Sequence, residues 1–174
     1  MRFSSTASVR PTHFTHNGKG YMNMSDEMTS RELMMAQMLR DTTVALGCEL
    51  IKRVGEEAAV AVFAGMMKGR VQALQDAGSL GAGFQVLADM VTKTAPIFGQ
   101  EVTFDVENMI CRVTKCGLCE SGRRMGYETT PLCIRCKANS DTVLAYVLPG
   151  YTKTIEKSLW WGDDECYMVY NRDK

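Results

Sequence analysis

Apolar side chains recur every three or four residues through the first half of the chain, which is the spacing of amphipathic helices. The first such stretch begins at a capping box formed by Thr29 and Glu32 and continues to residue 54, before a glycine. The second covers residues 56–77, and a third begins near residue 84 and ends at a proline, which cannot continue a helix. The pattern therefore predicts three helices in succession.

Beyond residue 100 the apolar period changes to two, which is typical of strands with one buried face. Residues 102–106 and 109–114 predict a first β-hairpin, and residues 151–161 and 165–170 predict a second. A helix opened by Thr130 and Pro131 is expected between them. Helices first and hairpins later, without alternation of strand and helix, predict an α+β fold in which the N-terminal helices pack on an antiparallel sheet of two hairpins. A cysteine-bearing helix lies between the hairpins.

The second predicted helix carries small residues at strict four-residue steps. Such a smooth stripe allows another backbone to approach closely, so it favours tight helix packing or the seam of a homodimer. A ligand groove is the alternative interpretation. The members of the stripe are Ala61, Gly65, Gly69, Ala73 and Ala77.

Composition supports one folded unit with a leader. The chain has 174 residues, 45% of them hydrophobic, which suffices for a single core. Residues 1–24 lack amphipathic periodicity and are interpreted as a flexible leader, and residues 25–174 as one α+β domain. The uncharged apolar run at residues 58–67 is too short to span a bilayer, so no membrane association is expected. Twenty basic and twenty acidic residues give zero formal charge, which argues against nucleic acid as a partner.

Cysteine spacing is the most specific signal in the sequence. Seven cysteines, an odd number, include two CxxC pairs, which favours metal or thiol chemistry in a reducing, cytoplasmic setting over a disulfide framework. Cys116, Cys119, Cys133 and Cys136 could supply four thiolates to a tetrahedral zinc ion, within a metal-site region at residues 111–137.

The other cysteines leave alternatives open. Cys111 adds a spacing that also suits an iron–sulfur cluster, although Cys111 and Cys48 lie in periodic apolar segments and are expected in the core. Cys166 follows a turn, where it could be a core residue, a further metal-site thiol or a nucleophile.

The predicted metal-site region is locally basic. Its positive charges could orient the carboxylate of a small acid, with Arg123, Arg124 and Arg135 as the candidate substrate-binding residues, or they could offset the charge of a four-thiolate zinc site. A nucleic-acid-binding zinc ribbon is a weaker interpretation, because the second cysteine pair opens a long helix. Both histidines lie in the leader, so general base chemistry would fall to a carboxylate, a thiolate or metal-bound hydroxide.

Four short motifs follow one another between residues 55 and 170. They are Gly55-Glu56-Glu57 at the start of a helix, Val113-Thr114-Lys115-Cys116 on a strand, a helix headed by Cys133 and Cys136, and the ending Lys157-Ser158-Leu159-Trp160-Trp161-Gly162-Asp163-Asp164-Glu165-Cys166. In this order, they resemble the family of L-2-amino-thiazoline-4-carboxylic acid hydrolase. They are also similar to the related 4-vinyl-reductase domain, which closes with a comparable Gly-Asp-x-x-Cys hairpin.

The resemblance implies an α+β ligand-binding fold with Cys116, Cys136 and Cys166 as recurring thiols. It implies ring opening of a cyclic amidine, so we expect a metal-binding hydrolase acting on a small carboxylated heterocycle, with Cys166 or Asp163 as the catalytic group. One departure is Ser158, which stands where zinc-holding 4-vinyl-reductase domains have a cysteine. The alternative function is a non-catalytic domain that binds a small molecule or senses redox state or metal.

Overall fold

The computed structural model describes residues 29–173, and the predicted leader at residues 1–24 lies outside them. Helix α1 covers Ser30–Val54 and α2 covers Glu56–Asp76. Helix α3 covers Phe84–Thr94 and continues as the 3-10 helix η1, Ala95–Phe98. The capping box predicted at Thr29 and Glu32 is confirmed, with both reciprocal hydrogen bonds present. The three predicted helices are therefore confirmed.

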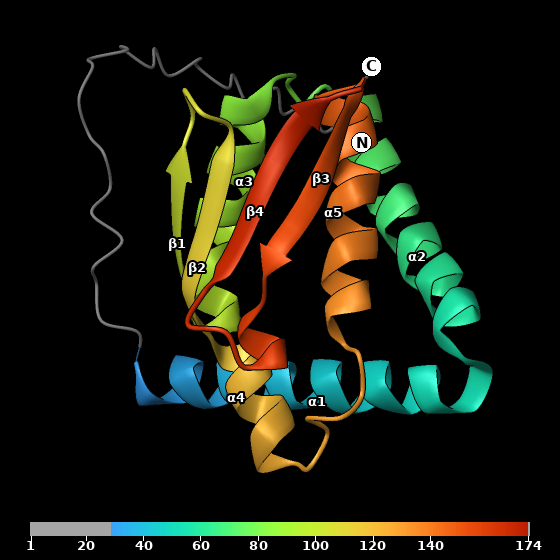
Figure 1. The fold of residues 1–174 in the computed structure, drawn as a ribbon, viewed down its shortest axis with the longest axis vertical. Helices are drawn as coiled ribbons and strands as arrows, with labels where there is room; N and C mark the ends of the chain where they lie inside the picture. The colour runs from blue at the N-terminus through green and yellow to red at the C-terminus, as the bar shows by residue number, and fades with distance from the viewer. Residues whose placement is uncertain (1–28, 174) are drawn as a thin grey trace, which may run out of the picture.

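Four strands form one antiparallel sheet (Figure 1). They are β1, Gln100–Asp105; β2, Ile110–Cys116; β3, Tyr151–Lys157; and β4, Cys166–Arg172. The order β1-β2-β4-β3 keeps both predicted hairpins and joins them through the pairing of β2 with β4. The α+β prediction is confirmed.

Two further helices lie between the hairpins: α4, Gly117–Arg124, and α5, Cys133–Val147. Gly117 and Gly122 predict an irregular, glycine-bearing turn after the first hairpin, and the structure forms α4 there instead. Both glycines are contact residues: a Cβ on Gly117 would lie 2.6 Å from the Phe98 carbonyl oxygen, and one on Gly122 would overlap the Trp160 ring. Helix α5 begins at Cys133, later than the Thr130 and Pro131 start that we predicted.

The second hairpin also differs from its prediction at its turn. Strand β3 ends at Lys157, and the 3-10 helix η2, Leu159–Trp161, follows where a longer strand was expected. The side chain of Ser158 accepts a hydrogen bond from the Trp160 backbone N–H, 3.2 Å away, and so opens this short helix. The turn is consequently a folded unit that packs inward, with Trp160 buried.

Helix α3 covers one face of the sheet, α5 lies beside it, and α2 packs on α5 (Figure 1). The Phe84 ring of α3 makes edge-to-face contacts with Phe104 of β1 and Tyr170 of β4, at centroid distances of 5.8 and 4.9 Å. Such aromatic pairs add specific geometry to apolar burial. Helix α1 runs across the end of the sheet at which β2 ends and β4 begins, and it contacts α4. Within the described residues, no helix is both long and apolar enough to cross a bilayer.

The small-residue stripe of α2 points outward. All five members are exposed, and a Cβ built on Gly65 or Gly69 would meet no atom within 4 Å. The stripe therefore does not pack against another described helix of this chain, so the prediction of tight internal packing is wrong. The dimer seam and the ligand groove stay predictions.

Candidate thiol site

Five cysteines gather at the end of the molecule nearest α1. Strand β2 ends there and β4 begins there, while α4 and α5 both have their first turns there (Figure 1). The negative charge of one thiolate in this group raises the pKa of others: Cys116 and Cys166 both act in this way on Cys133. Elements far apart in sequence therefore bring the predicted metal cysteines and the predicted catalytic cysteine into one neighbourhood. The group consists of Cys116, Cys119, Cys133, Cys136 and Cys166.

The first CxxC pair spans the junction of β2 and α4. Cys116 is the N-cap residue of α4, and Cys119 lies in its first turn. The neighbouring Cys119 thiol is the largest cause that lowers the pKa of Cys116 to about 6. The Gln100 side-chain amide donates a hydrogen bond to the Cys116 sulfur at 3.6 Å, and the nearby backbone N–H groups of Leu118 and Cys119 lower its pKa as well. These surroundings favour the thiolate form of Cys116.

The pKa of Cys119 shifts in the opposite direction. The neighbouring Cys116, together with burial, raises the pKa of Cys119. Both side chains are nearly enclosed, with 8% of Cys116 and 6% of Cys119 exposed. The pair therefore combines a thiol of lowered pKa with a thiol of raised pKa at the start of one helix, which suits a dithiol that takes part in thiol–disulfide exchange.

Tight backbone contacts fix the N-terminus of α4. The Gly117 N–H donates to the Gly99 carbonyl oxygen at 3.0 Å, and no side chain would fit between Gly117 and the Phe98 carbonyl. One turn later, Gly122 lies against the ring of Trp160, whose indole N–H donates to the Thr130 carbonyl oxygen at 2.7 Å. These contacts hold α4 between η1 and η2 and thereby set the direction of the Cys116 side chain.

The second CxxC pair opens α5. Cys133 is half-buried, and its sulfur lies 3.1 Å from the Ser158 hydroxyl oxygen. Burial raises the pKa of Cys133 to about 12. Part of Cys136 is exposed to solvent, but its sulfur is surrounded by protein atoms. This burial of the sulfur raises the pKa of Cys136 as well. Neither thiol of this pair is activated by its surroundings.

Cys166 and Asp163, the predicted catalytic residues, lie beside the second hairpin turn. The Cys166 sulfur accepts a hydrogen bond from the Leu159 backbone N–H at 3.3 Å, yet burial outweighs this bond and raises the pKa of Cys166. One Asp163 carboxylate oxygen accepts the Ser158 backbone N–H at 2.7 Å. Asp163 is therefore occupied in the turn, and within residues 29–173 Asp163 and Cys166 form no hydrogen bond with each other.

The three predicted substrate-binding arginines do not converge on the thiols through any hydrogen bond of the described chain. Arg123 donates to the Leu159 carbonyl oxygen, and Arg124 pairs with the Asp41 carboxylate of α1. The Arg135 side chain lies near Gly47 of α1. Their role in binding a carboxylated ligand stays a prediction.

No set of three or more His, Cys, Asp or Glu side chains within residues 29–173 is arranged to hold a metal ion. Cys48 and Cys111, expected in the core, are both buried, which confirms that interpretation. Burial raises the pKa of Cys48 to about 11 and that of Cys111 to about 12.

Sequence reasoning missed two residues at the site, Gln100 and Trp160. Gln100 lies sixteen residues before the sulfur that it contacts, and only the pairing of β1 with β2 brings them together. Trp160 stands in the recognised ending motif, but nothing local indicates that its ring would pack on Gly122. Ser158 was singled out as a departure, and the structure places its hydroxyl in contact with Cys133.

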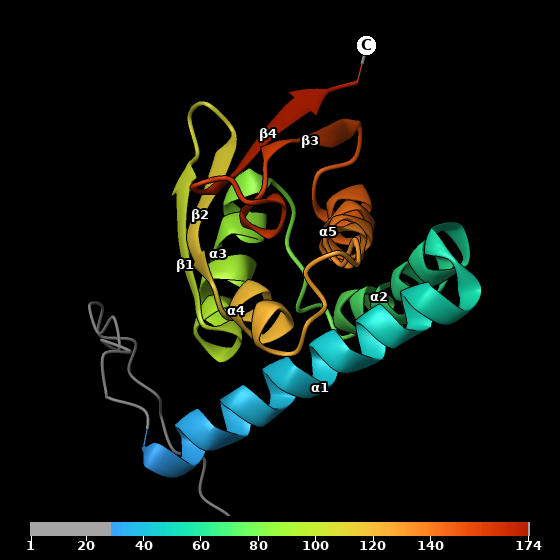
Figure 2. The same ribbon diagram turned by 60° about the horizontal axis from the view of Figure 1, so that its bottom comes forward.

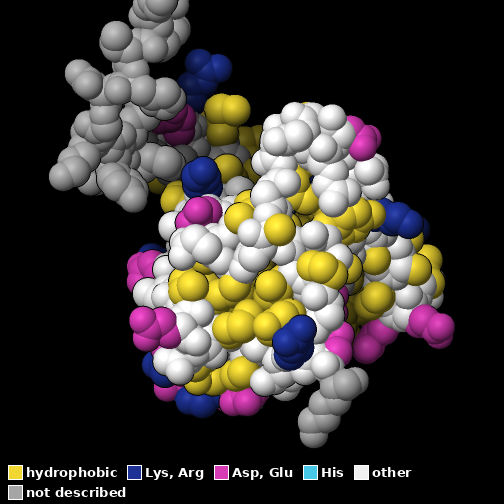
Figure 3. Space-filling view, turned by 90° about the horizontal axis from the view of Figure 1, so that it is seen from above, with side chains coloured by type: hydrophobic (Ala, Val, Ile, Leu, Met, Phe, Trp, Pro, Cys, Tyr) yellow, Lys and Arg dark blue, Asp and Glu magenta, His cyan; other side chains and the backbone are white. Residues whose placement is uncertain are grey.

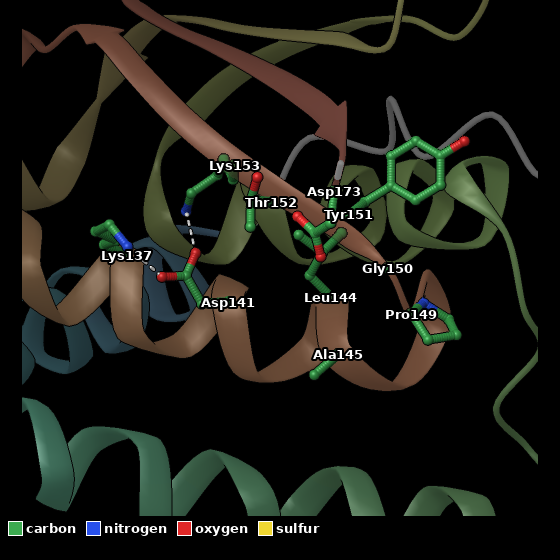
Figure 4. Close-up of a pocket in the computed structure, with 10 residues that line it drawn as sticks. All are labelled: Lys137, Asp141, Leu144, Ala145, Pro149, Gly150, Tyr151, Thr152, Lys153 and Asp173. Carbon is green, nitrogen blue, oxygen red and sulfur yellow. Dashed lines mark hydrogen bonds and ion pairs between the residues drawn. The ribbon is translucent and has the colours of Figure 1, made fainter.

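A separate hollow of about 330 Å³ extends along α5 from Lys137 toward the opposite end of the molecule, where β3 starts (Figure 4). Figure 3 views this end, where hydrophobic side chains gather. The Lys153 side chain is only 1% exposed and lies 3.7 Å from an Asp141 carboxylate oxygen, and burial lowers the pKa of Lys153. That oxygen accepts no hydrogen bond within the described chain. A water molecule would satisfy it, so the hollow carries no functional assignment.

No protein-family model matches this chain, and no curated protein or solved structure matches it either. The resemblance to the hydrolase family and to the 4-vinyl-reductase domain consequently stays a prediction from the motifs.

Proposed function

We propose that this protein is a thiol-based redox protein in which Cys116 and Cys119 cycle between a dithiol and a disulfide. The observation that carries the proposal is the placement of Cys116 at the N-cap of α4 and Cys119 in its first turn, with a lowered pKa at Cys116. Residues three apart in a first helical turn have Cβ atoms about 5–6 Å apart, whereas a disulfide requires about 3.5–4.5 Å, so the first turn of α4 must tighten by about 1–2 Å to form the bond. This corresponds to the redox-sensing alternative raised by the sequence.

The chemistry needs an external two-electron acceptor, which we take to be a small disulfide. The Cys116 thiolate attacks one sulfur of that disulfide, forms a mixed disulfide and expels the first thiolate. Cys119 then loses its proton and attacks the Cys116 sulfur, which forms the Cys116–Cys119 bond and expels the second thiolate. The protein loses two electrons and two protons overall, and the acceptor is reduced to two thiols. Because Cys116 is 8% exposed, the acceptor must be small.

Peptide-resolved mass spectrometry of the full chain, equilibrated in glutathione redox buffers, tests this proposal. We expect a Cys116–Cys119 disulfide that is lost in Cys116→Ser, and a mixed disulfide with glutathione on Cys116 in Cys119→Ser. Cys48→Ser is the matched control, because Cys48 is buried in α1 and its pKa is raised. Disulfides that join other cysteines, or persistent free thiols at Cys116 and Cys119, would overturn the proposal.

Zinc binding is a second candidate with one observation in its favour. Thiolates at Cys116, Cys133 and Cys166 each oppose ionisation of Cys119, and a cation among them would relieve that repulsion. The thiols would need to move closer, since the described residues contain no ready metal group. Metal analysis of protein purified without added metal tests it. Zinc that is lost in Cys119→Ser and Cys133→Ser supports the candidate, and iron with sulfide would instead support a cluster.

Ring opening of a cyclic amidine stays a prediction from the family resemblance. If it occurs, we assign the attack to Cys116 in place of Cys166, because the pKa of Cys116 is lowered and that of Cys166 is raised. Release of product from 2-aminothiazoline-4-carboxylate by the full chain, compared with Cys116→Ser and Cys166→Ser, tests this. A cytoplasmic, reducing setting suits all three candidates, since each needs free thiols.

A further inference from the structure

Helix α1 carries large apolar side chains on the face turned away from the rest of the described chain. Its buried residues include Ala36, Val44 and Ile51, and they lie on the inner face. Figure 2 shows α1 along one edge, with the sheet and the other helices on one side of it. The outer side chains are 47–68% exposed, which is unusual for so many large apolar groups on one helix. We call the following residues the outer patch: Met34, Met35, Met38, Leu39 and Leu46.

The outer patch has the spacing of a helix–helix seam. Met35, Met38, Thr42 and Leu46 follow one another at steps of three or four residues, so they lie along one stripe of α1. Arg31 precedes this stripe and Glu49 follows it at the same spacing. Thr42 is the one small polar residue within the apolar part. The stripe therefore ends in a positive charge at one end and a negative charge at the other.

The available area matches what a dimer requires. Five side chains with these exposed fractions amount to about 500 Å² of apolar surface, so two copies would bury about 1,000 Å² before flanking residues are counted. That sum reaches the lower limit of specific interfaces. Flanking backbone and side-chain stems would bring the total into the ordinary range.

We infer that the outer patch of α1 binds the outer patch of a second copy of this chain, with the two α1 helices antiparallel. A two-fold axis near residue 40 sets Met35 of one copy beside Leu46 of the other, and Arg31 beside Glu49. A parallel pairing would place Arg31 beside Arg31, which is repulsive. Arg31 forms no ion pair within residues 29–173. Glu49, by contrast, accepts a hydrogen bond from the Tyr127 hydroxyl at 3.2 Å and lies 3.7 Å from the Lys52 ammonium, in a half-exposed pair that Arg31 of the second copy would join. Charge complementarity thus selects the antiparallel second copy.

Sedimentation equilibrium of the full chain under reducing conditions tests this inference. Wild-type protein is expected to be a dimer at micromolar concentration. Met38→Glu puts two desolvated carboxylates in the seam and should raise the dissociation constant at least about a hundredfold. Met66→Glu is the matched control, since Met66 is a fully comparable exposed methionine on α2, outside the outer patch, and its variant should stay dimeric.

Three further variants test the pairing itself. Thr42→Leu adds apolar contact at both copies and should lower the dissociation constant about tenfold. Arg31→Glu should weaken the dimer, and adding Glu49→Arg should restore it. A wild-type monomer at all concentrations, or a dimer that Met66→Glu disrupts and Met38→Glu does not, would overturn the inference. With the first outcome, the outer patch would instead bind residues 1–28 or another protein. With the second outcome, the dimer interface would lie on α2.

Discussion

The two CxxC pairs share a spacing and differ in chemistry. The first begins at the N-cap of α4, where the Cys119 thiol and the backbone N–H groups of the first turn lie near the Cys116 sulfur. The second begins one position inside α5, because Leu132 is the N-cap there, and Cys133 meets the Ser158 hydroxyl instead. The neighbouring Cys119 lowers the pKa of Cys116 to about 6, whereas burial raises the pKa of Cys133 to about 12. Equal spacing therefore does not give equal ionisation, because the groups around each sulfur differ.

The largest expected contrast between the pairs is in titration. The alkylation rate of Cys116 should fall as pH drops through about 6, because protonation removes the thiolate, whereas Cys133 should gain reactivity only as pH rises toward about 12. Peptide-resolved alkylation over a pH series measures both midpoints. Equal midpoints for the two thiols would abolish the distinction drawn between the pairs.

Removing the Cys119 thiol should shift the titration midpoint of Cys116. Cys119→Ala eliminates the largest cause of the lowered pKa at Cys116, so the midpoint should rise by at least about one pH unit. Cys136→Ala removes the corresponding residue of the second pair and should leave the Cys116 midpoint nearly unchanged. A Cys116 midpoint that stays near 6 in Cys119→Ala would assign the effect to the backbone N–H groups.

Packing of α4 should matter more than packing of the α2 surface. Gly122→Ala forces a methyl group into the Trp160 ring and should lower the free energy of unfolding by about 1–3 kcal/mol. Gly65→Ala is the matched control: its methyl group meets nothing within 4 Å in the middle of a helix, so stability should rise by about 0.5–1 kcal/mol. Urea denaturation of both variants measures these changes in the free energy of unfolding. A destabilised Gly65→Ala would indicate that the α2 stripe is covered.

The smallest expected effect comes from removing the Ser158 hydroxyl, which lies beside Cys133 of the second CxxC pair. Ser158→Ala removes the acceptor of the Trp160 N–H and the partner of Cys133, and should cost about 1–2 kcal/mol of unfolding free energy. It should also raise the pKa of Cys133 further, since the hydroxyl lowers it. Ser79→Ala, at an exposed serine after α2, is the control and should change little. Unchanged stability in Ser158→Ala would show that water replaces the lost hydroxyl.

The sequence by itself determined the three N-terminal helices, the helix between the hairpins, the two hairpins and the α+β class, because periods of 3.6 and 2 follow directly from which faces are buried. The capping box at Thr29 was equally local. The sequence did not predict α4, because its glycines are set by contacts with distant residues. Glycines that usually interrupt helices proved necessary in α4, since distant atoms of Phe98 and Trp160 leave no room for a side chain.

Only the tertiary structure decided the chemistry of the thiols. The CxxC spacing named Cys116 and Cys119 as partners, but the start of α4 after Cys116 and the Gln100 amide beside the Cys116 sulfur depend on contacts between β1, β2 and η1. The tertiary structure also turned the α2 stripe outward and left the outer patch of α1 exposed. Periodicity shows that a helix has an apolar face, whereas exposure depends on whether another element lies against it.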